Sequence, residues 1–435
     1  MTAQQTGPLP SDNVRALPLP PPATRRHGSG FWAVAFAFLI VMAFATLPSP
    51  LYGLYRTRDN LSAFTVTVIY AIFAGGTIAA LMSVRFVAAR VGRRGVMLGA
   101  VATMMAAAGL LAAWKALPGL LIGRLVTGVA VGLVAGTAIT YLIELRARAS
   151  PSASPIPARN IGTAVNVGAL GVGPLIAGCL AQWVKWPLTL PYLLFVALGA
   201  IALIGLATAP ETGTAEPPTT AKSQAGGPSR SVRILVPGAA ATLAAFSANG
   251  LFAGLSGLFL ATTLNHPSHA LSGATLFLVF ASGVAAQLAT SGLPASRVLV
   301  LGTISMLIGL ALLVTAVRLT TPSLALFLLS GALIGAGAGA VFKGTTGLVL
   351  EATAPERRLA MTSDLLIALF VGLSIPVVGA GVALDRGASA PDTVLGFAIL
   401  VGLGVAGAGA LLGHALKGAE RPPGALPVKT PHPST

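Results

Sequence analysis

The chain has 435 residues, of which 55% are hydrophobic and only 9% are charged, and its formal net charge is +16. A soluble domain carries about 25% charged residues, so this composition excludes an ordinary soluble protein. The basic balance alone would suggest a nucleic-acid partner, but the positions of the charges, given below, explain it better. The single cysteine, Cys179, excludes an internal disulfide.

The chain begins with a Pro-rich polar tail, residues 1–30, which we expect to be a disordered cytoplasmic segment and not a cleavable signal. Twelve apolar runs follow, each long enough for a membrane helix, which needs about 20 residues. They span residues 31–55, 62–84, 95–114, 118–145, 160–184 and 188–209 in the first half, and 234–263, 270–290, 298–317, 322–350, 359–384 and 393–416 in the second. The sequence therefore predicts an all-α integral membrane protein with twelve transmembrane helices in two six-helix halves.

A segment without any apolar run, residues 210–233, separates the two halves. It contains Pro, Ser, Thr and charges of both signs, which predicts a solvated cytoplasmic linker. The resulting domains are an N-terminal half at 31–209, the linker, a C-terminal half at 234–416 and a cytoplasmic tail at 417–435. Two membrane halves joined by a soluble linker are typical of a transporter built from repeats.

The basic residues predict the orientation. With both termini in the cytoplasm, 19 Lys and Arg fall on the cytoplasmic side and 6 on the outer side, and the short loops alone give 10 against 6. This excess follows the positive-inside rule and predicts a multi-pass protein of the plasma membrane with cytoplasmic termini. Aromatic residues near the predicted helix ends indicate an interfacial belt; they are Trp32, Tyr52, Tyr55, Trp114, Tyr141, Trp183 and Trp186.

The loop between the second and third predicted helices, RFVAARVGRR at residues 85–94, carries a family motif. It resembles the cytoplasmic loop signature of the major facilitator superfamily, G-x-x-x-D-R-x-G-R-R, through Arg90, Gly92, Arg93 and Arg94. The resemblance implies a gating role for these four residues. In the family the Asp helps to lock the inner gate, and here that position is Ala89. An ordinary positive-inside loop is the alternative.

The fourth predicted helix contains Arg124 followed by Gly128, Gly132 and Gly136. This pattern resembles the superfamily's helix 4, in which an Arg precedes a ridge of small residues. Glycines four residues apart form one smooth face for close helix contact. Arg124 either snorkels to the surface, since it lies near the helix start, or faces the interior, where a charge is functional by default. We place it in the substrate pathway.

The fifth predicted helix contains Gly173 and Pro174 within GVGPLIAG. It is similar to the G-P-x-x-G-G signature associated with the superfamily's proton-coupled drug exporters, with Ala177 in place of one Gly. Proline removes a helix hydrogen bond and bends the segment, which predicts a gating role; a purely structural kink is the alternative. Local stretches at 47–52, 186–192, 210–212 and 372–379 resemble uncharacterised actinobacterial members. The resemblance covers nearly the whole chain and implies fold and transport, but no substrate.

Polar residues inside the second half complete the predicted site. Asn249 lies near the middle of the seventh predicted helix, close to Phe246. A buried amide needs a partner, so we expect Asn249 to line the central cavity, with Phe246 and Arg124 nearby. A hydrogen bond between helices is the alternative.

Two charges in the tenth and eleventh predicted helices lie at similar depths. Lys343 ends a small-residue ridge, and Asp364 follows the next loop. Helices joined by a short loop are usually neighbours, and an unpaired charge at that depth is costly. The sequence therefore predicts a Lys343–Asp364 ion pair, with Lys343 in the substrate pathway and Asp364 as the proton-coupling acid. A purely structural pair is the alternative, and it would leave Glu144, which is close to the end of its helix, or sodium coupling as the next candidates.

The leading functional hypothesis is a secondary active transporter that exports small amphipathic compounds by alternating access, coupled to protons. A proton- or sodium-coupled importer of a small solute is the alternative, and a membrane enzyme or non-transporting sensor is a third. The histidines, at 27, 266, 269, 414 and 432, form no catalytic constellation with acids, and neither a phosphate loop nor metal-ligand spacing occurs. We expect a monomer without enzyme activity, cofactor, metal or nucleic-acid partner.

Overall fold

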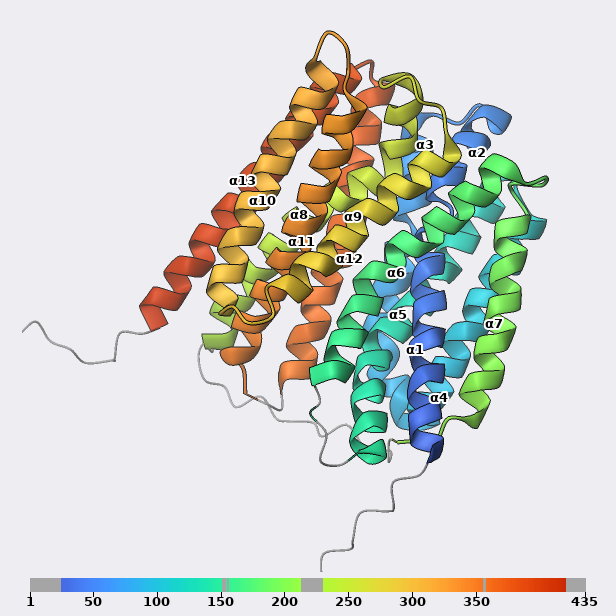
Figure 1. The fold of residues 1–435 in the computed structure, drawn as a ribbon, viewed down its shortest axis with the longest axis vertical. Helices are drawn as coiled ribbons and strands as arrows, with labels where there is room; N and C mark the ends of the chain where they lie inside the picture. The colour runs from blue at the N-terminus through green and yellow to red at the C-terminus, as the bar shows by residue number, and fades with distance from the viewer. Residues whose placement is uncertain (1–24, 151–153, 155, 213–229, 355–356, 420–435) are drawn as a thin grey trace, which may run out of the picture.

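The computed structural model describes residues 25–150, 154, 156–212, 230–354 and 357–419, and this part of the chain contains helices and no strand (Figure 1). The first half comprises α1 (Arg25–Thr46), the short 3-10 turn η1 (Ser49–Leu51), α2 (Tyr52–Asp59), α3 (Ala63–Ala71), α4 (Phe73–Ala113), α5 (Leu117–Ala149), α6 (Ile156–Trp183) and α7 (Leu190–Thr208). The second half comprises α8 (Arg230–Thr262), α9 (His269–Ala289), α10 (Ala295–Arg318), α11 (Leu324–Glu351), α12 (Arg358–Asp385) and α13 (Ala390–Ala419). Most of the predicted tails and linker, at residues 1–24, 213–229 and 420–435, lies outside the described residues. The ends of these predicted segments, at 25–30, 230–233 and 417–419, belong instead to α1, α8 and α13.

Eleven stretches of the described chain are long and apolar enough to cross a membrane, and one of them contains two crossings. Its helix α4 is interrupted at Gly92, where φ is 72° and ψ is 173°. Along the first limb of α4, Phe73 lies against Gly128 of α5 and Val84 lies against Gly136, so this limb and α5 run parallel. The limb after Gly92 must therefore return across the bundle. The result is the predicted twelve crossings.

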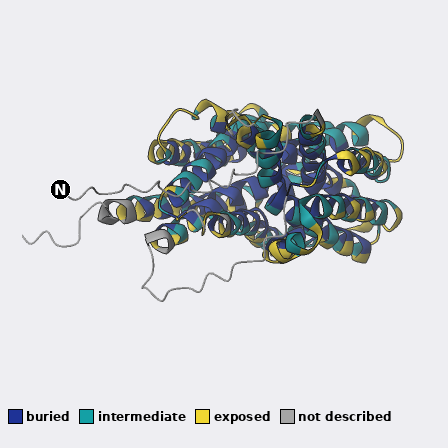
Figure 2. Cartoon of the chain, turned by 90° about the horizontal axis from the view of Figure 1, so that it is seen from below, coloured by how far each residue is buried: buried dark blue, intermediate teal, exposed yellow. Residues whose placement is uncertain are grey.

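The burial of the spans separates inner from outer helices. In the most apolar windows of the spans that contain α1 and α8, 78% and 83% of the residues are buried, against 33% in those of α7 and α13. Figure 2 shows buried residues along the inside of the bundle and exposed residues around its rim. Thus α1 and α8, one from each half, occupy the centre, and their side chains are the first candidates for a transport pathway.

The four tryptophans of the predicted aromatic belt fit the prediction, and the three tyrosines do not. The tryptophans are exposed, as side chains at a lipid interface would be; their exposed fractions are 65% for Trp32, 44% for Trp114, 73% for Trp183 and 77% for Trp186. The prediction was wrong for the three tyrosines, which are buried. Two of these tyrosines can be buried because their hydroxyls have hydrogen-bond partners. The Tyr55 and Tyr192 hydroxyls lie 3.2 Å apart, and the Tyr141 hydroxyl donates to Pro210 O at 2.8 Å.

The two halves meet across a seam whose polar contacts gather at one end of the bundle. We call the end with the Gly92 turn the basic end, and the opposite end, with α2, the far end. At the far end, the Asp385 carboxylate at the end of α12 accepts hydrogen bonds from the backbone N–H groups of Ala63 and Phe64, at 3.0 and 3.2 Å. At the same end, the backbone N–H of His269 in α9 donates a hydrogen bond to Oε1 of Gln182 in α6, at 2.9 Å.

Candidate functional site

Arg124 lies inside the first half rather than at its surface, with only 1% of its area exposed. Its guanidinium donates to three backbone carbonyls: to Ala45 at 2.5 Å, to Tyr70 at 3.1 Å and to Ile69 at 3.4 Å. The ring of Phe73 also lies beneath the cation, 4.7 Å from it. The positive charge is therefore held by backbone oxygens and aromatic rings.

The three carbonyls belong to helix ends that need a partner. Ala45 is in the last turn of α1, which ends at Thr46 before the prolines Pro48 and Pro50. The other two acceptors are in the last turn of α3, which ends at Ala71. The last carbonyls of a helix have no partner within it, and a cation is favourable at a helix C-terminus. Arg124 thus caps two helices that break inside the first half.

Lys343 has the corresponding role in the second half. Its Nζ donates to Gln287 O and lies 3.4 Å from Thr290 Oγ1, both at the end of α9. Lys343 is half-buried, whereas the Gln287 side chain is buried and has no hydrogen-bond partner for either amide atom among the described residues. A cation and an unpaired amide therefore lie together near the basic end of the second half.

The predicted Lys343–Asp364 ion pair is not formed between these two described residues, and this prediction was wrong. The short loop between α11 and α12 does not make them close neighbours: α11 packs mainly against α10 and α9, and α12 against α8 and α3. Lys343 consequently faces α9. Asp364 is exposed, on the same side of α12 as Ile375, which is 64% exposed and lies three turns further on.

Phe246 and Asn249 are buried on α8, the most buried helix of the second half, with exposed fractions of 0% and 1%. The Phe246 ring contacts that of Phe342 on α11 at 5.8 Å. The Asn249 side-chain oxygen has no hydrogen-bond partner among the described residues. Arg124 makes its polar contacts within the first half, so these contacts do not join the three predicted residues into one cluster.

The Gly92 turn at the basic end is built around Glu211. The Glu211 carboxylate accepts hydrogen bonds from the backbone N–H groups of Arg93 and Arg94, at 3.1 and 3.0 Å. A Cβ added at Gly92 would lie 2.6 Å from Glu211 Oε2, and its φ of 72° also disfavours other residues. Glu211 follows α7, so it binds the start of the returning limb of α4 as a helix cap does.

A second carboxylate completes this basic-end cluster. Glu144 of α5 forms an ion pair with the Arg93 side chain and accepts a hydrogen bond from Thr212 Oγ1 at 2.7 Å. The cluster therefore ties α4, α5 and the segment after α7 together within the first half. The remaining predicted gating arginine, Arg90, is exposed at the edge of the turn.

The Gly173–Pro174 pair lies where α6 packs on α1. Proline at 174 leaves the Leu170 carbonyl without its helix partner, and Thr46 Oγ1 donates to that carbonyl at 2.5 Å. A Cβ added at Gly173 would overlap the backbone of Ala43. The predicted bend therefore has a specific partner on α1, and Gly173 permits the close approach.

Sequence reasoning missed the tertiary contacts of five residues; they are Thr46, Glu144, Glu211, Gln287 and Asp385. Glu211 gave the clearest available signal, a carboxylate just after an apolar run and near an Arg-rich turn. The other four gave no signal of their partners, because each of those partners is 51 or more residues away in sequence. Among the described residues, no three His, Cys, Asp or Glu side chains come close enough to hold a metal ion.

The comparisons with known proteins agree with this architecture. The family model described as "Sugar (and other) transporter" matches residues 29–212, which is the first half. Among solved structures, the nucleoside transporter NupG, crystallised as a single-residue mutant, matches with a TM-score of 0.63 over 90% of this chain and 100% of its own, at 13% identity. At that identity the similarity shows a shared fold. No curated protein matches this chain.

The described chain is a multi-pass membrane protein. Its fold is that of the major facilitator superfamily, and the family match of the first half together with the fold shared with a nucleoside transporter supports a transporter rather than an enzyme.

Proposed function

We propose that the protein is a secondary active transporter that exports small amphipathic compounds by alternating access, with protons as the coupling ion. The two halves would rock about the seam, opening the central helices α1 and α8 to each side in turn. The observation that carries this proposal is the distribution of contacts along the seam. Cross-seam hydrogen bonds gather at the far end, while the polar cluster at the basic end stays within the first half.

The seam has the composition expected of a surface that opens and closes. Where α6 crosses α9, Gly178 lies against His269 and Gly273 lies against Pro174, so backbones approach closely without interlocking side chains. The Asp385 carboxylate adds a cap on α3 from the other half. Such contacts can separate and re-form without repacking either half, which supports rigid-body motion.

The Asp385 cap gives a direct test of this motion. In Asp385→Ala the two N–H groups lose a cross-seam acceptor, so the far end should open more often and a cysteine introduced at Val66 should react faster with a membrane-impermeant maleimide. Asp392→Ala is the matched control, because Asp392 pairs with Arg318 within the second half at 2.5 Å. Equal labelling rates in the two variants would contradict a closing role for the seam.

The coupling acid is the least constrained part of the proposal, and Asp364 remains our candidate. Glu144 already binds Arg93 and Thr212, whereas Asp364 lies within a crossing and has no ion-pair partner among the described residues. In proteoliposomes, Asp364→Asn should abolish pH-driven transport and retain substrate exchange. Intact proton-driven accumulation in this variant would exclude Asp364 and direct attention to sodium coupling.

Import of a small solute is the second candidate, favoured by the match of residues 29–212 to the family of sugar and other transporters. Direction and substrate can be tested together in proteoliposomes of defined orientation. Counterflow of labelled sugars, nucleosides and amphipathic cations would be measured with an imposed proton gradient of either sign. Accumulation of a sugar or nucleoside with the gradient, without movement of the amphipathic compounds, would overturn the export proposal.

A further inference from the structure

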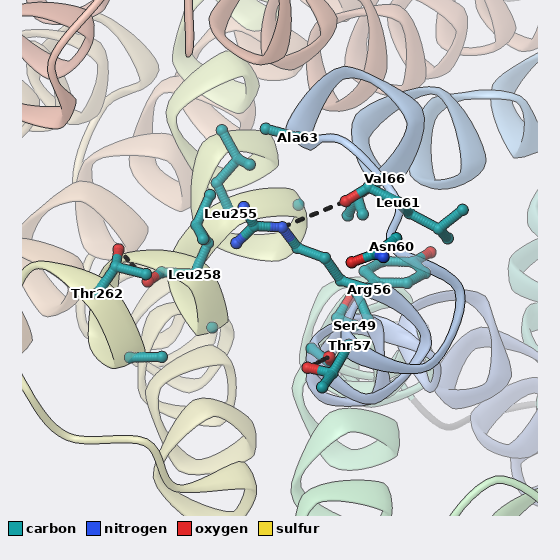
Figure 3. Close-up of a pocket in the computed structure, with 15 residues that line it drawn as sticks. Ser49, Arg56, Thr57, Asn60, Leu61, Ala63, Val66, Leu255, Leu258 and Thr262 are labelled. Atoms are coloured by element: carbon teal, nitrogen blue, oxygen red, sulfur yellow. Dashed lines mark hydrogen bonds between the residues drawn. The ribbon is translucent and has the colours of Figure 1, made fainter. Parts of the chain in front are cut away.

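A cavity of about 480 Å³ opens at the far end, on the seam between the halves (Figure 3). Its first-half wall comes from η1, α2 and the turn before α3, and its second-half wall is the stretch of α8 from Gly254 to Thr262. A smaller cavity of about 220 Å³ adjoins it through Arg56 and reaches Asp385 of α12. In this conformation the seam is therefore open between α2 and α8.

The seam is closed on both sides of this opening. On one side, the Asp385 carboxylate accepts a hydrogen bond from the N–H group of Ala63, which lines both cavities. On the other side, His269 Nδ1 lies 3.2 Å from Pro50 O, and a Cβ added at Gly53 of the main cavity would lie 3.8 Å from the His269 ring. Complete closure of the far end therefore requires α2 to approach α8.

Helix α2 is tied to the first half. The Tyr55 hydroxyl lies 3.2 Å from that of Tyr192 in α7, and Arg58 Nη2 donates to Lys115 O, between α4 and α5, at 2.6 Å. In the described part of the chain, no hydrogen bond or ion pair joins α2 to the second half. A change in the gap between α2 and α8 is therefore a movement of one half against the other.

Arg56 is the side chain of α2 that extends across this gap, toward Leu255 of α8 (Figure 3). It is half-buried, and its Nε donates to Leu61 O at 3.3 Å. No other partner for its guanidinium occurs among the described residues. Because an arginine carries five N–H donors, four remain for an acceptor on the second half.

Asp385 carries the complementary charge on the second half. Its two carboxylate oxygens each accept one backbone N–H, from Ala63 and from Phe64, whereas a carboxylate has about four acceptor positions. It is also the last residue of α12, where the helix dipole disfavours a negative charge and favours a cation. A guanidinium can therefore join Asp385 without displacing the two N–H groups of α3.

Arg56 and Asp385 line the same small cavity from opposite halves but form no ion pair in this conformation. Most of the remaining lining is apolar and includes Leu258, Phe259 and Leu384. Contraction of the cavity brings the two charges together beside these apolar groups, where their attraction is stronger than in water. We propose that Arg56 and Asp385 form an ion pair across the seam when the far end closes completely, and that this pair stabilises the closed state.

The pair rests on the proposed rocking of the two halves, and it makes Arg56 a positioning residue for closure. The test measures the distance across the far end in the purified full-length protein in phosphatidylcholine nanodiscs. Spin labels are attached to Ala116→Cys and Thr320→Cys in a Cys179→Ser background, at exposed positions of the two halves that line neither cavity. Double electron–electron resonance then gives the ratio of closed to open far ends. Arg56→Gln should lower this ratio about two- to fivefold, the range for a partly exposed ion pair.

Arg58→Gln is the matched control, because it removes the same charge two residues away from an arginine that pairs with Asp59 within the first half. It should leave the ratio unchanged. Arg56→Lys keeps the charge and should lower the ratio by a smaller factor than Arg56→Gln. Raising the salt concentration to about 1 M screens partly exposed charges, so it should lower the wild-type ratio and change that of Arg56→Gln less.

A double-mutant cycle separates the ion pair from the hydrogen bonds that Asp385 makes to α3. Asp385→Asn weakens those hydrogen bonds and also removes the charge, so it should lower the ratio by itself. In the Asp385→Asn background, Arg56→Gln should then have no further effect, because its partner is already absent.

Three results would overturn the proposal. These are a wild-type ratio in Arg56→Gln, an equal decrease in Arg58→Gln, and independent effects of Arg56→Gln and Asp385→Asn. If Asp385→Asn opened the far end and Arg56→Gln did not, the rocking of the halves would stand and the ion pair would fail. A single distance that no variant changes would mean that the far end does not move, which would overturn the rocking together with the pair.

Discussion

Each half of the protein contains the same type of close helix contact, but the cation beside that contact lies at a different end of it in the two halves. In the first half, Gly128 and Gly132 of α5 lie against the backbone of Phe73 and Thr77 in α4. Any side chain at these two glycines would overlap that backbone. The contact is therefore a ridge of small residues on α5 that lets two parallel helices approach closely.

In the second half, Gly335 and Gly339 of α11 form the equivalent ridge against Val279 and Gly283 of α9. The spacing of four residues and the parallel direction are the same. Lys343 continues this ridge by one turn, and its partner Gln287 continues the α9 side by one turn. The same register thus places a cation opposite the end of a helix.

The cations lie at opposite ends of the two ridges. Arg124 comes one turn before Gly128, whereas Lys343 comes one turn after Gly339. The reason lies in the neighbouring helices, because α3 ends inside the first half and leaves buried carbonyls, while α9 runs on and ends near the basic end. A fully buried cap requires the many donors of an arginine, and a half-buried cap can be made by a lysine.

The largest expected effect comes from filling either ridge. Gly128→Val and Gly335→Val should each destabilise the protein by about 3 kcal/mol or more, because backbone would have to move to make room. Thermal melting and the yield of monodisperse protein would measure this. Gly99→Val is the control, since no atom lies within 4 Å of a Cβ at that position. Behaviour like the control in either half would show that its ridge is not in close contact.

Removing the buried cap should have the next largest effect. Arg124→Leu leaves three carbonyls without a partner and should cost about 3 kcal/mol, and Arg124→Lys should fall between this variant and the wild type. The melting temperature of the purified protein is the measurement. Arg297→Leu, at an exposed arginine, controls for loss of charge. A melting temperature for Arg124→Leu equal to that of the control would refute the capping role.

Removing the half-buried cap should cost less. Lys343→Met keeps most of the apolar stem and leaves one α9 carbonyl that is close to the basic end, so we expect a loss of about 1 kcal/mol. If Lys343→Met were as destabilising as Arg124→Leu, the distinction drawn between the halves would fail. The two variants should be compared in the same melting experiment.

The same variant tests whether Lys343 and Asp364 interact. Because the two residues face different neighbours, the effects of Lys343→Met and Asp364→Asn on stability should add within about 0.5 kcal/mol in a double-mutant cycle. A larger coupling energy would mean that an ion pair forms in another conformation of the protein. The cycle thus separates a static lysine cap from a charge pair that forms during transport.

A similarly small effect is expected at the α1–α6 contact. Thr46→Val removes the donor to the Leu170 carbonyl and should cost about 1 kcal/mol in the wild type. In Pro174→Ala the helix can supply its own N–H, so the same substitution should then cost less. An equal cost in both backgrounds would show that Thr46 does not compensate for the proline.

The sequence by itself determined the fold and its segments. Apolar runs of membrane length identified the twelve crossings to within a few residues, because a bilayer imposes that length on any spanning helix. The Arg-rich turn at Gly92 and the glycine ridges were also visible, since turns and close helix contacts depend on small residues at fixed spacing. The general region of the Pro174 bend followed from the chemistry of proline.

Only the tertiary structure decided which groups meet. The short loop after α11 suggested that Lys343 would find Asp364, but the packing of α11 on α9 gave it the carbonyl of Gln287 instead. Arg124 could have reached the surface, and its burial depends on where α1 and α3 break. Backbone carbonyls satisfy both cations, and every residue has one. A sequence therefore shows that a buried charge needs a partner, but only the packing determines which helix end supplies it.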